Sequence, residues 1–389
     1  MEATTTVAAP VGALPGEKTK PTRLASLDAL RGFDMFWIMG GEGIAHALAK
    51  TTRWPVFNWL SKELEHTPWH GFTFYDMIFP LFLFIAGVSM PFSLGARLAK
   101  ADGGASKRAL YASMIRRTLL LIFLGMVVNG LFEWNGYENT RFASVLGRIG
   151  LAWFFAGLIY LNTHLRGQIL WFVGLLVGYW AAMTLVPVPG FGAGVLTTEG
   201  SLAAYLDRLL LPGKLYLGVH DPEGLFSAIP AVGTALLGVF TGRFLRHDSP
   251  RWPMVRKGIA LAVAGTVLLG LGSAWNLVFP INKNLWTSSF VVYVGGWSLI
   301  FLAVFYLIID VAGYRRWAFL FTLIGLNSIT IYLASHGMIN FLSTANFFFG
   351  GLIRQAPEPW QAVWTATAIV VVQLALLYFL YRNKLFLRV

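Results

Sequence analysis

The sequence contains no cysteine and few charged residues, and each of these features excludes some classes of protein. Without cysteine among its 389 residues, the chain cannot use disulfides, thiolate catalysis, zinc–thiolate sites or iron–sulfur clusters. Charged residues make up 12% of the chain, about half the share usual in soluble domains. Such a composition leaves too little charge to cover the surface of a water-soluble globule.

Hydrophobic residues are abundant instead, at 56% of the chain, and the mean hydropathy is +0.63. That content excludes a disordered chain and indicates an all-α fold, a polytopic helical membrane protein. Ten apolar runs have the length needed to cross a bilayer: 28–49, 73–95, 111–133, 145–162, 168–187, 225–245, 257–278, 287–311, 317–337 and 360–382. The aromatic stretch 338–359, between the last two, is either a re-entrant segment or a further span.

Basic residues occur in alternate connections. The net charge is +12. In a soluble protein this excess would suggest nucleic acid, but here we expect no nucleic-acid partner. With ten spans, both termini and the basic connections share one side, which the positive-inside rule makes cytoplasmic. Residues 1–22 have no apolar run and are predicted to be a flexible cytoplasmic tail, with 23–389 as one membrane domain. The long connection 188–224 is expected to contain a short interfacial helix near 200–211.

An acidic and a basic residue lie close together in the first predicted span. Asp34 lies about a turn inside the apolar run, where a carboxylate is costly unless it is paired. Arg31 lies three residues earlier and can reach the same helix face. The sequence therefore predicts a structural Arg31–Asp34 pair, with ligand binding near the inner surface as the alternative.

Two histidines and an aspartate precede or begin the second predicted span. His66 and His70 lie in the loop, and Asp76 lies in the first turns of the helix. A carboxylate there suits the positive end of the helix dipole. It also suits an acid that orients a histidine, so that the other ring nitrogen can act as a base. Two solvated loop histidines are the alternative, and no third ligand for a metal ion is evident, so we expect no metal site.

Further polar residues occur in the connections on the same side. Asp221 and Glu223 form a dense acidic turn, which is either a helix cap or a polar wall for a hydrophilic acceptor. Asn282, Lys283 and Asn284 precede the eighth predicted span. They form either an interfacial cap or a set of hydrogen-bond donors for a sugar or an oxyanion.

Arg148 lies inside the fourth predicted span. An intramembrane arginine usually faces a cavity or an acidic partner. The alternative is that its side chain extends to the membrane surface.

Six motifs occur together in one order along the chain, and together they resemble a known family. They resemble the transmembrane acyltransferase family of heparan-alpha-glucosaminide N-acetyltransferases over about residues 23–382. The motifs are RLASLDALRG at 23–32, HxxWxGxTxxDxxFPxF at 66–82, VLGRIG at 145–150, DPEG at 221–224, NKNLW at 282–286 and GLNSI at 325–329.

The resemblance implies transfer of an acetyl group across a membrane. Acetyl-CoA would be the donor on the cytoplasmic side, and an amino sugar on the opposite face would be the acceptor. The family's catalytic histidine matches His66, in a context that includes Trp69, and the following acid matches Asp76. The family also suggests a homodimer, and a bacterial inner membrane is the expected location. Its Asn before the histidine has no clear counterpart here, so Glu42, Asn58 or no residue takes that place.

The basic side chains near the cytoplasmic surface are the expected ligands of the CoA phosphates. His66 would act either as a general base or as a carrier of the acetyl group, with an oxyanion stabilised by Arg148 or by the amides of Asn282 and Asn284. The candidate phosphate ligands are Arg31, Arg116, Arg117 and Arg243.

Two other functions fit part of the pattern. An O-acyltransferase of a cell-surface glycan would place its key histidine in the first helix, where His46 is the local candidate. A sugar or anion transporter would also use intramembrane charge, although the sequence shows no inverted repeat.

Overall fold

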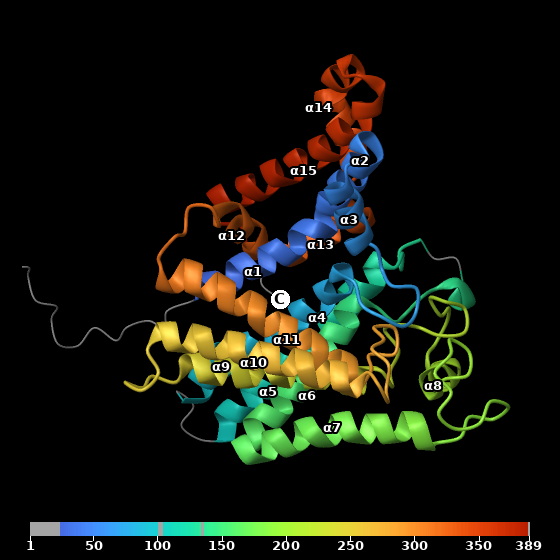
Figure 1. The fold of residues 1–389 in the computed structure, drawn as a ribbon, viewed down its shortest axis with the longest axis vertical. Helices are drawn as coiled ribbons and strands as arrows, with labels where there is room; N and C mark the ends of the chain where they lie inside the picture. Colours follow the sequence, from blue (N-terminus) through green and yellow to red (C-terminus); the bar gives the residue numbers. More distant parts are fainter. Residues whose placement is uncertain (1–23, 100–103, 134–135, 388–389) are drawn as a thin grey trace, which may run out of the picture.

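A computed structural model describes residues 24–99, 104–133 and 136–387 of the chain, and the regular elements of this part are all helices, joined by loops (Figure 1). The predicted tail at 1–22 lies outside the described residues. The helices are α1 Ala25–Phe36, η1 Trp37–Gly41, α2 Glu42–Thr52, α3 Pro55–Glu63, α4 Phe74–Ala99, α5 Gly104–Val128, η2 Tyr137–Asn139, α6 Val145–Asn162, α7 Leu165–Leu185, α8 Leu202–Leu210, α9 Ala228–Arg246, α10 Met254–Trp275, α11 Ser288–Phe305, η3 Tyr306–Val311, α12 Phe319–Leu326, α13 Ser328–Leu333, η4 Ala334–Met338, α14 Phe341–Gln355 and α15 Glu358–Arg382.

Most of the predicted spans are single long helices. Within the described residues, eight helices are long and apolar enough to cross a membrane: α4, α5, α6, α7, α9, α10, α11 and α15. The chain is therefore a multi-pass membrane protein, as the composition predicts.

The first and ninth predicted spans are interrupted. The first consists of α1, η1 and α2, with a break at Gly40, whose φ is 143°. The ninth is divided at Asn327 into α12 and a segment that begins with α13, and the two are bent by 74°. Such breaks are tolerated inside a membrane protein where neighbouring helices or a cavity satisfy the backbone.

Two shorter helices lie beside the spans. The predicted interfacial helix is α8, which begins after the Ser201 cap. The stretch 338–359 holds α14, whose 15 residues are too few to cross a bilayer. Instead, α14 packs against α15 in a hairpin that projects from one side of the molecule (Figure 1).

The centre of the bundle is formed by α4 and α9, which are the most buried spans. Glycines allow their backbones to approach closely, as in many membrane helix pairs. A Cβ at Gly87 would lie 2.1 Å from the Ala235 carbonyl oxygen, and one at Gly238 would lie 2.2 Å from that of Phe84. The neighbours α1 with α12, α5 with α6, and α10 with α11 pack around this pair.

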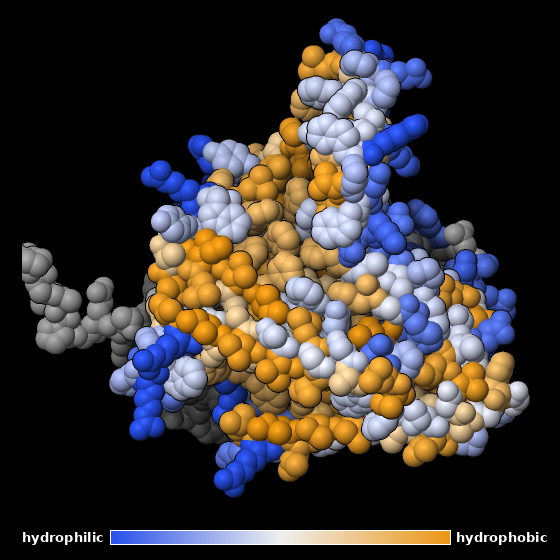
Figure 2. Space-filling model, viewed as in Figure 1, coloured by the Kyte–Doolittle hydropathy of each residue, from blue (hydrophilic) through white to orange (hydrophobic). Residues whose placement is uncertain are grey.

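The two ends of the bundle differ in their polar groups. At one end, here called the basic end, α9 meets α10 and α4 ends, and hydrophilic residues border a broad hydrophobic band over α10 and α7 (Figure 2). At the opposite end, here called the site end, lie the segments 64–73, 186–227 and 276–287. These three segments hold the polar motifs discussed next.

Candidate active site

His66 and Asp76 contact each other at the site end, as their motif suggests. The His66 Nδ1 atom lies 2.9 Å from Oδ1 of Asp76. The side chain of Asp76 is 1% exposed, whereas that of His66 is 52% exposed. Because a carboxylate accepts the Nδ1 proton, the lone pair of the ring is placed on Nε2. A buried acid therefore orients an accessible imidazole.

The second oxygen of Asp76 is also fully engaged. Oδ2 accepts from the backbone amides of Thr67 and Thr73, both at 3.3 Å, and from the Thr73 hydroxyl at 3.2 Å. Both residues lie in the loop that enters α4. The carboxylate is thus fixed by the same local fold that carries His66.

Lys283 joins this pair from 217 residues further along the chain. Its Nζ lies 3.0 Å from His66 Nδ1, 3.1 Å from His66 Nε2 and 3.7 Å from Asp76 Oδ1. Because Nζ is almost equally far from the two ring nitrogens, the ammonium group lies over the face of the imidazole and leaves the Nε2 lone pair accessible. Burial lowers the pKa of Lys283, and the charges of Asp76 and Glu223 oppose that shift.

A tight turn over residues 282–286 holds Lys283 in place. Asn282 Oδ1 accepts from the Leu285 amide at 2.8 Å, and its Nδ2 lies 3.3 Å from His70 Nδ1. Trp286 has a φ of 51° and is buried, a conformation that a bulky residue adopts only under constraint. The Gly71 amide donates to the Ile281 carbonyl at 2.9 Å, which joins this turn to the His66 loop.

The acidic turn forms ion pairs with an arginine that the motifs did not indicate, and this arrangement is here called the Arg141–Asp221 clamp. Arg141 binds both Asp221 oxygens, at 2.8 and 2.6 Å, and also contacts Glu223. Burial would raise the pKa of Asp221, but the bonds and charge of Arg141 hold it below its usual value. The two carboxylates in turn raise the pKa of Arg141 despite its burial. The only sequence signal was a lone arginine among the acidic connections.

Arg148 does not reach the membrane surface, since it is 2% exposed. Its NH2 group donates to the Gly224 carbonyl at 3.1 Å and contacts the Ser227 hydroxyl. The guanidinium also lies over the Trp286 ring, 5.0 Å from its centroid. Arg148 therefore links the acidic turn to the 282–286 turn from inside the bundle.

The remaining predicted acceptor-side residues act through loop contacts. Trp69 Nε1 donates to the Leu196 carbonyl at 2.8 Å, which fastens the His66 loop to the long connection. The Asn284 carbonyl lies 3.1 Å from His220 Nε2. Asn284 thus contacts the neighbouring loop through its backbone carbonyl rather than through its side-chain amide.

A cavity of about 270 Å³ begins near two of the four predicted phosphate ligands. Arg31 and Arg117 line it and are close enough to repel each other. Arg116, one residue away, is exposed, and Arg243 donates to Gln168 at 3.2 Å, so neither lines the cavity.

The cavity extends along α4 toward the site. Its wall includes Phe82 and Phe79, and Phe79 lies one helical turn after Asp76. Phe79 also packs edge-on against Trp286, at 5.0 Å between centroids. Arg31 and Arg117 thus share a cavity with Phe79, which lies one helical turn from Asp76, while His66, Asp76 and Lys283 lie outside its lining.

The predicted Arg31–Asp34 pair is wrong. Arg31 pairs with Asp28, at 3.3 Å, which lies one turn nearer the basic end of the helix. Asp34 is 1% exposed, and its Oδ2 has no hydrogen-bond partner among the described residues. Both carboxylates lie three residues from Arg31 along the chain, so spacing alone could not choose between them.

Glu42 lies close to the candidate site, whereas Asn58 and His46 are engaged elsewhere. The Glu42 carboxylate lies near the Tyr75 side chain, and the Tyr75 ring lies 4.6 Å from that of His66. Asn58 donates to the Arg53 carbonyl at 3.2 Å, and His46 Nδ1 lies 2.7 Å from the Ser61 hydroxyl. In the described part of the chain, no three His, Asp or Glu side chains are grouped closely enough to hold a metal ion.

Comparison with known proteins agrees with the motifs. Heparan-alpha-glucosaminide N-acetyltransferase of Homo sapiens is 26% identical to this chain over 428 residues, which cover 95% of the chain and 60% of the human protein. The Mus musculus protein of the same name is 28% identical over 381 residues, covering 84% of the chain and 56% of the mouse protein. The chain thus spans less than two thirds of the length of either relative.

A family model described as heparan-alpha-glucosaminide N-acetyltransferase, catalytic, matches residues 23–279. That segment contains His66, Asp76 and the acidic turn, and it ends just before the turn that carries Lys283. Because the match covers more than half of the chain, this protein belongs to the heparan-alpha-glucosaminide N-acetyltransferase catalytic family.

Proposed function

We propose that this protein transfers the acetyl group of acetyl-CoA to the amine of a glucosamine-type sugar. The observation that carries the proposal is the oriented His66–Asp76 pair beyond the far end of a cavity that begins at Arg31 and Arg117. The curated relatives are named as N-acetyltransferases of a glucosaminide, which supports the same donor and acceptor classes.

The proposed donor enters from the basic end of the bundle, which we assign to the cytoplasm by the positive-inside rule. Acetyl-CoA is a polyanion, and Arg31 and Arg117 supply two neighbouring guanidinium groups for its phosphates. The pantetheine arm would extend through the cavity past Phe82 and Phe79. The thioester would then reach the level of His66, at the non-cytoplasmic face.

The proposed chemistry begins with attack of the neutral acceptor amine on the thioester carbonyl. As the carbon–nitrogen bond forms, His66 Nε2 accepts the proton that the attacking nitrogen loses. The tetrahedral intermediate collapses as its carbon–sulfur bond breaks, and His66 returns the proton to the departing CoA thiolate. Asp76 stabilises the imidazolium that exists between the two steps and holds the ring in its reactive tautomer.

A covalent route uses the same side chains in two steps. His66 Nε2 would attack the thioester and release CoA, and the acetylimidazole would then transfer its acetyl group to the amine. Lys283 suits both routes, because its Nζ lies 3.1 Å from Nε2, where an ammonium group can stabilise an oxyanion formed beside the ring. The two routes differ in kinetics, since only the covalent one releases CoA before the acceptor binds.

The direct test is acetyl-CoA turnover by the detergent-purified protein with glucosamine as acceptor. We expect CoA thiol and acetylglucosamine to form together, and His66→Ala to reduce the rate by roughly 100-fold or more. His164→Ala is the matched control, because His164 is exposed just before α7 and lies outside the three segments of the site end. We expect this variant to retain activity within a few-fold of wild type.

The results also separate the other two functions. Release of CoA with a hydroxyl acceptor but not with glucosamine would replace N-acetylation by O-acylation. Absence of acetyl-CoA binding would contradict any acyltransferase and favour a transporter.

A further inference from the structure

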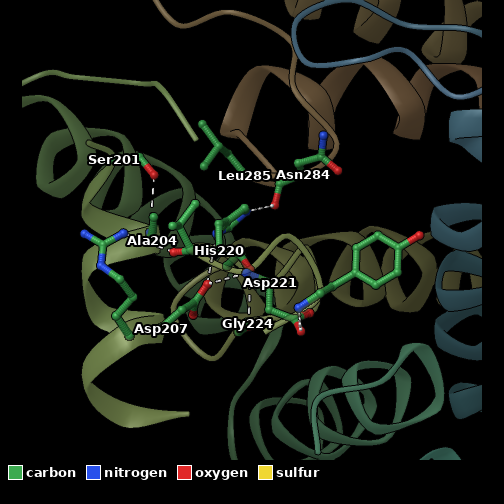
Figure 3. Close-up of polar contacts among 12 residues, drawn as sticks. Ser201, Ala204, Asp207, His220, Asp221, Gly224, Asn284 and Leu285 are labelled. Carbon is green, nitrogen blue, oxygen red and sulfur yellow. Dashed lines mark hydrogen bonds and ion pairs between the residues drawn. The ribbon is translucent and has the colours of Figure 1, made fainter. Parts of the chain in front are cut away.

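A buried histidine also lies at the site end, outside the chemistry described so far. His220 is 0% exposed and Asp207 is 1% exposed. Its Nδ1 lies 3.0 Å from Asp207 Oδ2, an ion-pair contact, and its Nε2 lies 3.1 Å from the Asn284 carbonyl oxygen. Figure 3 shows the ring of His220 lying between these two groups.

Both neighbours of the ring are hydrogen-bond acceptors. A carboxylate and a carbonyl oxygen each need an N–H, and a neutral imidazole has one. Nε2 bonds the Asn284 carbonyl, whereas Nδ1 lies 3.0 Å from Asp207 Oδ2 but makes no hydrogen bond among the described residues. The bond to Asn284 is therefore the polar contact through which His220 can hold a backbone in place.

The ion pair joins three segments that are distant in sequence. Asp207 belongs to α8, and its Oδ2 also accepts from the Asp221 amide at 3.3 Å. Trp69, from the loop that carries His66, packs edge-on against the His220 ring at 5.9 Å between centroids. The third segment is the 282–286 turn, which His220 contacts at Asn284.

The contact with Asn284 is the one that bears on catalysis. Asn284 follows Lys283 directly, so the carbonyl that His220 binds fixes the backbone from which the Lys283 side chain extends toward His66. We propose that His220 is a positioning residue, which holds the 282–286 turn so that Lys283 lies over His66. This inference rests on the proposed acetyltransfer for its kinetic test, but not for its structural one.

The kinetic test is a double-mutant cycle between His220 and Lys283. His220→Phe keeps an aromatic ring beside Trp69 and removes both polar contacts. We expect kcat to fall by about 10- to 100-fold with little change in the KM for acetyl-CoA. In a Lys283→Ala background, the same substitution is expected to lower kcat by less than about twofold.

A matched control separates positioning from general loosening of the loop. Ser201 caps α8 by accepting from the Ala204 amide at 3.2 Å (Figure 3). Ser201→Ala removes that cap and should cost about 1 kcal/mol of stability, without contacting the 282–286 turn. Its effect on kcat should be small and equal in both backgrounds. Equal losses for His220→Phe in both backgrounds would overturn the proposal.

Hydrogen exchange provides the structural test and needs no activity. The amides of Leu285, Trp286 and Thr287 are bonded within the turn. We expect them to exchange at least about tenfold faster in His220→Phe and not in Ser201→Ala. If the wild type shows no turnover, the proposed function fails while this measurement still decides the inference.

Two further variants address a failure of His220→Phe to fold. His220→Gln retains one N–H donor for the Asn284 carbonyl, and Asp207→Asn retains an acceptor for His220. We expect both to give intermediate exchange rates and to show the same coupling to Lys283. Unchanged exchange in both would contradict the positioning role.

Discussion

At the scale of single residues, the site depends on a carboxylate that is buried and an imidazole that is not. Asp76→Asn preserves the shape of the side chain and removes the charge that orients His66 and stabilises its imidazolium. We expect kcat to fall by roughly 100-fold or more, with the KM for acetyl-CoA nearly unchanged. Steady-state kinetics on purified protein checks this, and Asp248→Asn, at an exposed position between α9 and α10, serves as a control carboxylate. A kcat within threefold of wild type would contradict the assigned role of Asp76.

The Arg141–Asp221 clamp predicts a specific dependence of stability on pH. The pKa of Asp221 is lower in the folded protein than its ordinary value near 4. Folding is therefore stabilised by this group above about pH 4, and the stabilisation is lost as the pH falls through the lowered folded value. Asp221→Asn should cost about 3 kcal/mol at neutral pH, since it leaves Arg141 with one carboxylate.

Thermal unfolding in detergent from pH 6 to pH 3 tests this behaviour. The difference in Tm between wild type and Asp221→Asn should be constant above pH 4 and should shrink below it. Glu138→Gln, at an exposed position, should follow the wild-type curve throughout. A difference that stays constant down to pH 3 would show that Asp221 is not the titrating group.

At the scale of helices, the crossing of α4 and α9 holds the acid in register with the rest of the site. Gly238→Ala would place a Cβ 2.2 Å from the Phe84 carbonyl oxygen of α4, so the helices must separate. We expect a loss of about 1–3 kcal/mol together with lower activity, because Asp76 is carried by α4.

A second glycine provides the matched control for this crossing. A Cβ at Gly174 of α7 would meet nothing within 4 Å, so Gly174→Ala should leave both Tm and activity close to wild type. Fluorescence-detected thermal stability of the two variants checks the prediction. Equal Tm values for the two would mean that the crossing tolerates separation.

The apolar runs predicted the positions of most helices, but not their interruptions. Hydropathy places α6 at Val145–Asn162, because length and composition alone decide whether a segment can cross a bilayer. The breaks at Gly40 and Asn327 do not follow from composition. Membrane helices tolerate such residues both with and without a bend, according to what their neighbours provide.

At the scale of the whole molecule, the proposed reaction uses both faces of the membrane through one cavity. Arg117→Met removes a guanidinium group and keeps a long, unbranched side chain. We expect the KM for acetyl-CoA to rise by about tenfold, with little change in the KM for the acceptor. Arg116→Met is the control, since Arg116 is adjacent in sequence but exposed. Equal effects of the two variants would indicate nonspecific attraction to the basic surface.

Sequence alone determined the features that depend on neighbouring residues. Composition identified a membrane protein, and basic connections indicated an orientation. The ten-residue spacing from His66 to Asp76 allowed their contact but left solvated loop histidines as the alternative, and the family motif favoured the pair that the structure shows. Asp28 and Asp34, each three residues from Arg31, could not be distinguished in the same way, since only the positions of the side chains in the folded protein show which one is paired.

The tertiary structure decided everything that depends on which loops meet. Lys283 lies over His66, Arg141 clamps Asp221, and His220 contacts the Asn284 carbonyl across 217, 80 and 64 residues respectively. No local pattern encodes these partners, because each contact depends on how helices far apart in the chain pack side by side. The histidine and its acid could thus be predicted from the chain, whereas the lysine beside them could be recognised only in the folded molecule.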